Sequence, residues 1–406
     1  MPPPSEPTYS FSIPSLHDNT PLHCRIYHPQ HSNQHSTSAP QSENHKSPTR
    51  AAIVAHPYAP LGGCYDDPVV LSIVDALVRE GVVVGTFNFR GAADSAGSTS
   101  LSGKGEQADY ESVVGLLLCY LRSLISLEEA HDHGDAGNET AEEKHGLQGN
   151  EKIDLLLAGY SYGSLVLARL SPVQEILLRF EAAAATPGQA VAEILATARK
   201  LASETTQRHL DERNAHITTF GSADRNSTNK SHPHRHHVRL SADLAHDTLE
   251  KLHFKRRNSP RNPSDIPKQT TAEQHPTTRP TISPSYLFIS PVILPLTLSI
   301  CPPGAVASLP SLSFLGKGRS PSPSSSSSHS SAHYLQHRTL AVFGNKDSFT
   351  SSHRLRLWAE KQSREAAAAG TSDTGFEWTE IEGAGHFWRE EGVMGALQRR
   401  VTSWWK

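Results

Sequence analysis

Short apolar runs alternate along the chain with longer stretches in which apolar positions recur every three or four residues. The runs are typical of strands buried on both faces, and the recurring positions are typical of amphipathic helices. The pattern predicts strands at residues 9–13, 22–27, 51–56, 82–88, 153–158, 286–293, 339–343 and 377–381. It predicts helices at residues 67–80, 107–127, 163–170, 353–368 and 393–405.

This alternation of strands and helices predicts an α/β fold with a mostly parallel central sheet and helices on both faces. The first two strands flank a turn-like segment at residues 17–20 and are expected to form a hairpin. In open α/β sheets the functional residues lie at the carboxyl ends of the strands. Chemistry is therefore expected in the segments that directly follow the strands.

Long polar stretches interrupt the pattern. We expect one domain over residues 1–406, with a polar loop at 29–50, an insertion at 172–284 and a Ser-rich loop at 316–332. Only 36% of the residues are hydrophobic and the mean hydropathy is −0.45, which agrees with long inserts of disordered composition. Within the insertion, residues 187–203 have helical periodicity, either as a cap over a pocket or as a surface helix packed on the domain.

Charge and cysteine content exclude some classes of protein. There are 38 Lys and Arg against 41 Asp and Glu, which argues against a nucleic-acid binder that relies on a basic surface. Four cysteines without a CxxC pair exclude a disulfide-built secreted domain and a zinc ribbon. A His-rich run at residues 232–237 lacks ordered ligand spacing, so neither a metal nor another cofactor is expected.

No signal for export or membrane insertion stands out. The amino terminus has neither a basic nor an apolar signal region, and the most apolar window, residues 286–300, is short and interrupted by Pro291 and Pro295. We therefore expect no membrane span and a cytoplasmic location.

The segment Gly159-Tyr160-Ser161-Tyr162-Gly163 lies between a predicted strand and a predicted helix. A GxSxG sequence in this context is typical of a nucleophile elbow, in which a sharp turn presents the serine hydroxyl at the amino end of a helix. Small residues are needed two positions to either side, because larger ones would clash across the turn. Ser161 is therefore the candidate nucleophile.

A serine hydroxyl needs a base, and the expected chain order is Ser, then Asp or Glu, then His. Asp347 and His386 each follow a predicted strand, and His386 lies in a Gly-rich segment. We predict that His386 accepts the serine proton and that Asp347 orients it, with Asp373 and Glu382 as competing acids. For the oxyanion hole we predict the backbone N–H groups of Tyr162 and Tyr58, although residues 61–63 are further candidate donors.

Five segments in this order resemble the α/β-hydrolase superfamily: HPYAPLGG, FNFRGAADSAG, GYSYGS, FGNKD and GAGHFW. They are most similar to the small bacterial-type predicted hydrolases and their fungal relatives. The resemblance implies an α/β-hydrolase fold, with Ser161, Asp347 and His386 as the triad and Tyr58 and Tyr162 as oxyanion donors. The chain departs from the pattern at Ala92-Ala93, where a pair containing glycine is expected, and in its long inserts.

These observations predict a serine hydrolase that cleaves an ester, thioester or related acyl bond of a small molecule through an acyl-enzyme. Ser at position 161 disfavours epoxide hydrolases and dehalogenases, which use an Asp nucleophile in this fold. Two alternatives stay open: a non-catalytic protein of the same fold that binds a ligand or partner, and an acyltransferase or cyclase that uses the same triad. The number of subunits is not predicted.

Overall fold

The computed structural model describes residues 5–29, 49–100, 103–134, 152–182, 188–220, 280–293, 332–369 and 375–406. The chain divides into two compact units. The first comprises residues 1–208 and 279–406 and contains the whole sheet; the second comprises residues 209–278, of which only the end of one helix is described. The fold and the site below belong to the first unit.

The described strands form one eight-stranded sheet in the order β1-β2-β4-β3-β5-β6-β7-β8. The strands are β1 (Tyr9–Pro14), β2 (Pro21–Tyr27), β3 (Thr49–Ala55), β4 (Val83–Phe87), β5 (Lys152–Tyr160), β6 (Thr281–Ile289), β7 (Arg338–Lys346) and β8 (Phe376–Gly385). β2 pairs antiparallel with both β1 and β4, and the remaining pairs are parallel. The predicted hairpin and the mostly parallel sheet are confirmed.

The central strands are buried on both faces, as their continuous apolar sequences predict. Along β3, Ala51, Ile53 and Ala55 belong to one core cluster, whereas Ala52 and Val54 belong to the other. Successive side chains of a strand point to opposite faces, so each strand contributes to two cores.

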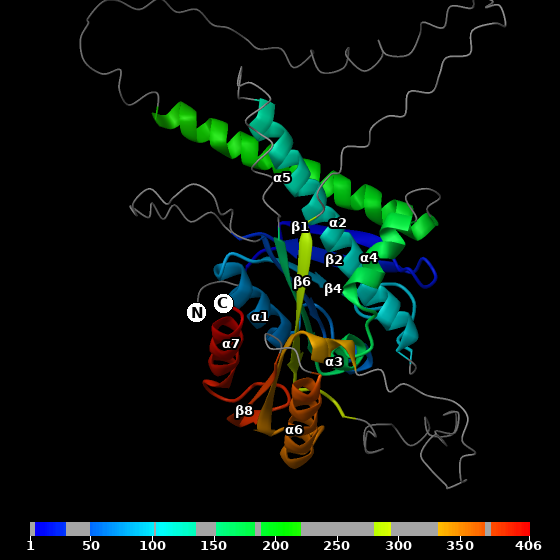
Figure 1. The fold of residues 1–406 in the computed structure, drawn as a ribbon, viewed down its shortest axis with the longest axis vertical. Coiled ribbons are helices and arrows are strands. Elements are labelled where there is room, and N and C mark those ends of the chain that lie inside the picture. The colour runs from blue at the N-terminus through cyan, green and yellow to red at the C-terminus, as the bar shows by residue number, and fades with distance from the viewer. Residues whose placement is uncertain are drawn as a thin grey trace, which may run out of the picture. The chain divides into compact units, whose positions relative to one another are not determined.

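Helices cover each face (Figure 1). α1 (Pro68–Arg79) and α7 (Val393–Trp404) pack into one core. The other core contains buried residues of α2 (Lys104–Gly134), α3 (Tyr162–Leu167), α4 (Val173–Ala182), α5 (Gln189–Phe220) and α6 (Ser352–Ala368). With helices on both faces of a mostly parallel sheet, the α/β-hydrolase fold predicted from the sequence is confirmed.

The region predicted as an insertion at residues 172–284 contains more regular structure than its composition indicates. Both α4 and α5 lie in it, and β6 begins at Thr281 rather than at residue 286. Pro284 lies within β6 although proline cannot donate to a ladder. Pro284 pairs with Leu155 of β5, whereas pairing of β6 with β7 starts only at Ser285, so on the β7 side no ladder partner faces Pro284.

The predicted helix at residues 187–203 is the first part of α5. The Thr205 hydroxyl lies 2.8 Å from the Tyr9 hydroxyl and 2.9 Å from the Tyr120 hydroxyl. The Tyr120 hydroxyl also lies 2.7 Å from His28 Nε2. His28 follows β2, which runs antiparallel to β4, so the end of β2 lies at the amino edge of the parallel strands. This part of α5 therefore packs at the amino edge of the parallel strands, opposite the edge that carries the predicted site residues.

Several predicted features lie outside the described residues. They include most of the polar loop at 29–50, the His-rich run at 232–237 and nearly all of the Ser-rich loop at 316–332. Within the described part, one helix is long and apolar enough to cross a membrane, residues 104–128 of α2, but 72% of its window is buried inside the fold. Core helices of globular domains share this property.

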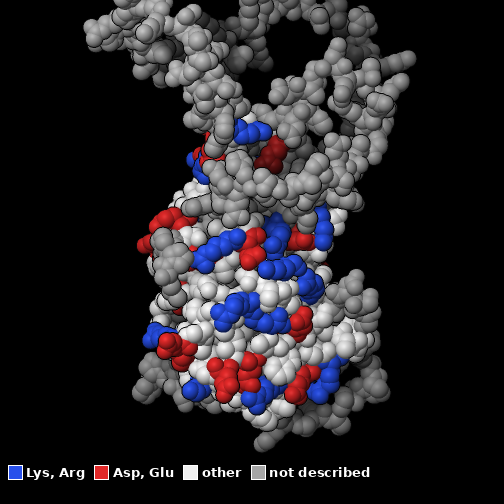
Figure 2. Space-filling view, turned by 90° about the vertical axis from the view of Figure 1, so that its left-hand side faces the viewer, with Lys and Arg blue, Asp and Glu red and all other residues white. Residues whose placement is uncertain are grey.

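Acidic and basic side chains are interspersed on the face shown in Figure 2. Lys and Arg side chains gather over its middle, with Asp and Glu side chains among and below them. This mixture agrees with the nearly balanced charge of the chain.

Candidate active site

Ser161 occupies a strained turn between β5 and α3. Its backbone angles are φ 55° and ψ −112°, a region that residues with a side chain rarely adopt. The Ser161 N–H donates to the carbonyl of Ile289 on the neighbouring strand β6, at 2.9 Å. The turn is thereby tied to the sheet, and α3 begins at the next residue.

The two glycines of the GxSxG motif make this turn possible. A Cβ atom on Gly159 would overlap the backbone of Gly163, and one on Gly163 would lie 2.8 Å from the carbonyl oxygens of Ala55 and His56. The elbow therefore packs directly against the end of β3, and side chains at either position would force the two apart.

The imidazole of His386 bonds both to the candidate nucleophile and to the candidate acid. His386 Nε2 lies 2.9 Å from Ser161 Oγ, and Nδ1 lies 2.7 Å from Asp347 Oδ2. All three side chains are buried, with exposed fractions of 6% for Ser161, 3% for His386 and 8% for Asp347. The structure thus brings together three residues that follow β5, β7 and β8 at the same edge of the sheet.

The Asp347 carboxylate is held by its own loop. Its Oδ1 atom accepts hydrogen bonds from the backbone N–H groups of Phe349, at 2.8 Å, and Thr350, at 3.0 Å. These bonds leave Oδ2 directed at the imidazole. Of the two competing acids, Glu382 is exposed and Asp373 lies outside the described residues.

Two aromatic side chains that the sequence analysis did not single out contact His386. The Phe349 ring stacks on the imidazole, with centroids 4.2 Å apart, and the Tyr160 hydroxyl donates to the His386 carbonyl at 2.9 Å. Tyr160 directly precedes Ser161 in the GxSxG motif, and Phe349 lies two residues beyond Asp347. In the sequence, only this proximity to the motif residues indicates that the two aromatic residues belong to the site. Burial raises the pKa of Tyr160, which keeps its hydroxyl protonated as a donor.

The segment after β3 turns back toward α3. The Tyr58 carbonyl accepts hydrogen bonds from Leu61 and Gly63, and a Cβ atom on Gly63 would overlap the backbone of Pro57. The rings of Tyr58 and Tyr162 lie 5.1 Å apart, so the two residues predicted to supply oxyanion donors are neighbours. Tyr162 is the first residue of α3, and its N–H therefore has no acceptor within the helix. Their role as donors stays a prediction.

The His56 side chain links this segment to the chain after β4 through contacts of both ring nitrogens. Its Nε2 atom accepts the N–H of Phe89 at 2.9 Å, which requires the ring proton on Nδ1, 2.6 Å from the Pro57 carbonyl. The side chain is fully buried, and this burial lowers its pKa to about 4 despite the opposing bond to Pro57. Both ring nitrogens of His56 are thus used within the fold, whereas the imidazole of His386 lies beside Ser161.

The NFRG segment after β4 is held by an ion-pair network. The Arg90 guanidinium donates to both carboxylate oxygens of Asp109 and to Asp18. At the unusual Ala92-Ala93 pair the chain keeps the left-handed conformation that glycine favours, because Ala93 has a φ of 42°. Ala93 therefore occupies a backbone conformation that glycine would adopt more readily.

Among the described residues, no group of three or more His, Cys, Asp or Glu side chains is placed to hold a metal ion. A hydroxyl, an imidazole and a carboxylate in this order form a hydrogen-bonded chain in which the imidazole can take the hydroxyl proton and the carboxylate can stabilise the imidazolium.

No protein-family model and no curated protein matches the chain. Among solved structures, it is similar to an α/β serine hydrolase from Xanthomonas campestris, at 16% identity over 99% of this chain and 98% of that one, with a TM-score of 0.40. It is also similar to an α/β serine hydrolase homologue from Coxiella burnetii (14% identity, 98% and 97% covered, TM-score 0.39) and to an esterase from Pyrococcus furiosus (12%, 98% and 92%, 0.42). These similarities are too weak to carry the site, which rests on the distances between its own side chains.

Proposed function

We propose that the protein is a serine hydrolase that cleaves an ester, thioester or related acyl bond of a small molecule through an acyl-enzyme. The observation that carries the proposal is the double contact of His386, at 2.9 Å from Ser161 Oγ and 2.7 Å from Asp347 Oδ2. We also propose that the chain is a member of the α/β-hydrolase superfamily, related to the small bacterial-type hydrolases and their fungal relatives.

In the first half-reaction Ser161 Oγ attacks the substrate carbonyl carbon while His386 Nε2 takes the hydroxyl proton. The resulting imidazolium is oriented and stabilised by Asp347, whose Oδ1 atom is held by two backbone N–H groups. His386 then gives the proton to the leaving group as the tetrahedral intermediate collapses to the acyl-enzyme. Water, deprotonated by His386, then attacks the acyl-enzyme. The C–O bond to Ser161 breaks, His386 returns the proton to Ser161 Oγ, and the acid is released.

The negative charge on the substrate oxygen requires donors that are already in place. We assign this role to the backbone N–H groups of Tyr162 and Tyr58. Tyr162 opens α3, where the helix dipole favours negative charge, and the contact between the two tyrosine rings supports placing Tyr58 beside it.

A fluorophosphonate probe tests the proposal, because it reacts covalently with an activated serine. We expect the wild-type protein to be labelled, and Ser161→Ala and His386→Ala to lose labelling while keeping the wild-type circular dichroism spectrum. Ser348→Ala, a change at an exposed serine near the site, is the matched control and should be labelled like the wild type.

Other results would change the assignment. Labelling that persists in Ser161→Ala contradicts the proposed nucleophile. A folded wild-type protein that is not labelled supports the non-catalytic, ligand-binding alternative. Labelling accompanied by product only in the presence of an alcohol or amine acceptor supports the acyltransferase alternative.

A further inference from the structure

We propose that a buried hydrogen bond between Trp388 and Ser290 positions His386 against Ser161, an inference that rests on the proposed function. The indole Nε1–H of Trp388 donates to Ser290 Oγ, and the two atoms are 3.1 Å apart. The Trp388 side chain is 2% exposed and Ser290 is fully buried. The bond is therefore shielded from water, and removing either group leaves the other buried without this partner.

The backbone is strained at both ends of the bond. Ser290 has a φ of 42° and Trp388 a φ of 56°, in the left-handed region that residues with a side chain rarely adopt. In the described part of the chain, five residues other than glycine have a positive φ, and three of them are Ser161, Ser290 and Trp388. Such strain persists where the surrounding structure holds it, and it is concentrated at functional sites. The bond thus joins two strained turns close to a third.

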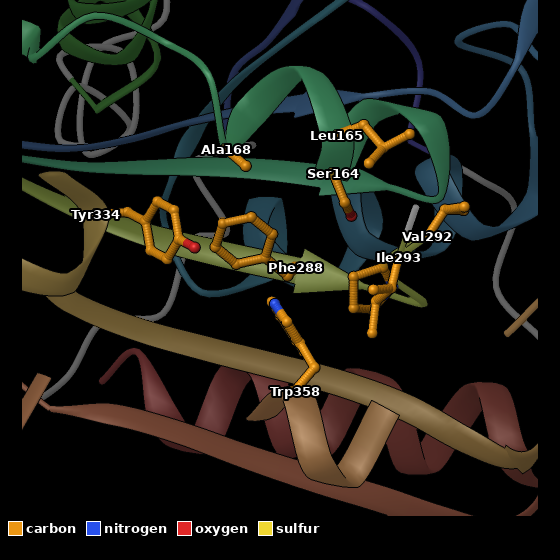
Figure 3. Close-up of a pocket in the computed structure, with 9 residues that line it drawn as sticks. Ser164, Leu165, Ala168, Phe288, Val292, Ile293, Tyr334 and Trp358 are labelled. Carbon is orange, nitrogen blue, oxygen red and sulfur yellow. The ribbon is translucent and has the colours of Figure 1, made fainter. Parts of the chain in front are cut away.

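Ser290 belongs to the backbone that holds the nucleophile. It directly follows Ile289, whose carbonyl accepts the N–H of Ser161 at 2.9 Å. The Ser164 hydroxyl points from α3 toward β6 (Figure 3) and lies 3.2 Å from the same carbonyl oxygen. The N–H of Ser290 donates to the Val342 carbonyl on β7 at 2.8 Å. Ser290 is therefore fixed both to the elbow and to the neighbouring strand.

Trp388 belongs to the turn that carries the base. It lies two residues beyond His386, and its backbone N–H donates to the Gly385 carbonyl at 3.3 Å. The Tyr160 hydroxyl donates to the His386 carbonyl at 2.9 Å, and the Trp388 ring packs in the core shared with α1 and α7. This turn is therefore held through its backbone by Tyr160 and through a side chain by Ser290.

The bond joins the elbow and the His386 turn independently of the triad contacts. Its ends lie one residue beyond Ile289, which holds Ser161, and two residues beyond His386. The distance of 2.9 Å between His386 Nε2 and Ser161 Oγ therefore depends on how these two turns are held together. Because the imidazole takes the proton only at hydrogen-bond distance, loss of the bond should impair the chemical steps rather than substrate binding.

Substitutions that remove the bond from either end test the inference. Trp388→Phe keeps an aromatic ring without the donor, and Ser290→Ala removes one oxygen atom. In hydrolysis of p-nitrophenyl acetate we expect each to lower kcat by about 10- to 100-fold with KM within about twofold of the wild-type value, because a misplacement of about 1 Å has an effect of this size. The double variant should lose no more than the more affected single variant, since both changes act through one bond.

The rate of fluorophosphonate labelling should fall in parallel, and this second readout does not depend on the choice of ester. The matched controls are Trp404→Phe, at a second buried tryptophan of the same core, and Ser285→Ala, at a buried serine earlier in β6. Both should keep the wild-type kcat and labelling rate, even where they lower the free energy of unfolding. Circular dichroism verifies that each variant is folded at the assay temperature.

The failures of the two proposals are distinguishable. A labelled, active wild type whose kcat and labelling rate are unchanged in Ser290→Ala overturns the positioning role and leaves the hydrolase intact, whether or not Trp388→Phe folds. Single losses that multiply in the double variant, or equal losses in the controls, also overturn it. A folded wild-type protein that neither hydrolyses the ester nor is labelled overturns the proposed function and this inference with it.

Discussion

The ring of Phe349 stacks on the imidazole of His386, with centroids 4.2 Å apart and planes inclined by 28°. The backbone N–H of Phe349 also donates to Asp347 Oδ1 at 2.8 Å. One residue therefore contacts the candidate base through its ring and the candidate acid through its backbone. Phe387 contacts the same imidazole edge-on, at 5.5 Å, and its side chain is 46% exposed.

We expect Phe349→Ala to lower kcat by up to about tenfold, because an aromatic pair is worth about 0.5–1.5 kcal/mol and its loss frees the imidazole to reorient. KM should stay within about twofold of the wild-type value, since Phe349 positions the base and is not assigned to substrate binding. Phe349→Tyr should restore kcat. Steady-state ester hydrolysis measures both constants. Phe387→Ala is the control, and an equal effect there would show that stacking is not the cause.

Replacing Asp347 tests what the orientation of His386 contributes, because the imidazole itself stays in the protein. In Asp347→Asn the amide oxygen can still accept the backbone N–H groups, but the amide nitrogen then faces Nδ1 and favours the wrong tautomer. We expect kcat to fall by about 10⁴-fold with the fold retained. Glu382→Gln, at the exposed competing acid, should leave kcat unchanged. A large loss in Glu382→Gln with a small one in Asp347→Asn would transfer the acid role to Glu382.

The close approach of the elbow to β3 predicts the effect of a single methyl group. Gly163→Ala places a Cβ atom 2.8 Å from two backbone carbonyl oxygens, which cannot move aside as a side chain would. We expect the free energy of unfolding to fall by about 1–3 kcal/mol and fluorophosphonate labelling to slow. Gly188→Ala, where the new Cβ meets no atom within 4 Å, is the matched control. Urea unfolding of the two variants compares them, and equal stabilities would contradict the proposed close packing.

The buried His56 predicts a loss of stability at acidic pH. Its pKa is about 4 in the folded state, below the ordinary value of 6.5, so between these values the unfolded chain binds more protons. Stability is therefore fully present above pH 6.5 and is lost as the pH falls toward 4, by about 2.5 kcal/mol from this group at pH 4.5.

Urea unfolding at pH 7 and pH 4.5 measures this contribution of His56. The difference between the two pH values should be smaller in His56→Gln, which keeps an acceptor for the Phe89 N–H but does not titrate. Other titrating groups contribute equally to both proteins and cancel in the comparison. Identical pH dependence in the wild type and the variant would show that His56 is not buried in its neutral form.

The left-handed conformation of Ala93 predicts a stabilising substitution. This conformation costs an L-residue about 1–2 kcal/mol, whereas glycine adopts it without strain at an entropic cost of about 0.5–1 kcal/mol. Ala93 is exposed, so its methyl group contributes little packing. We expect Ala93→Gly to raise the free energy of unfolding by about 0.5 kcal/mol, as measured by thermal melting. Ala96→Gly, at an exposed alanine whose φ is not positive, should lower it.

The sequence by itself determined the sheet, the elbow and the candidate residues, because these depend on local chemistry. Apolar runs such as Leu155–Ala158 can be buried on both faces only as inner strands, and the glycines of GxSxG leave room for a sharp turn at Ser161. Asp347 and His386 were found because each directly follows a strand. Parallel strands bring such positions to one edge whatever the exact register.

Tertiary structure alone decided which side chains meet at that edge. Ser161 and His386 are 225 residues apart, and their contact depends on strand order and on the length of each loop. Periodicity predicts a helix with an apolar face over residues 187–203, but only the contacts of Thr205 and Tyr120 place that helix at the amino edge. The stacking of Phe349 on His386 likewise joins two separate segments, because side-chain contacts across a fold are set by packing and leave no periodic signal in the chain.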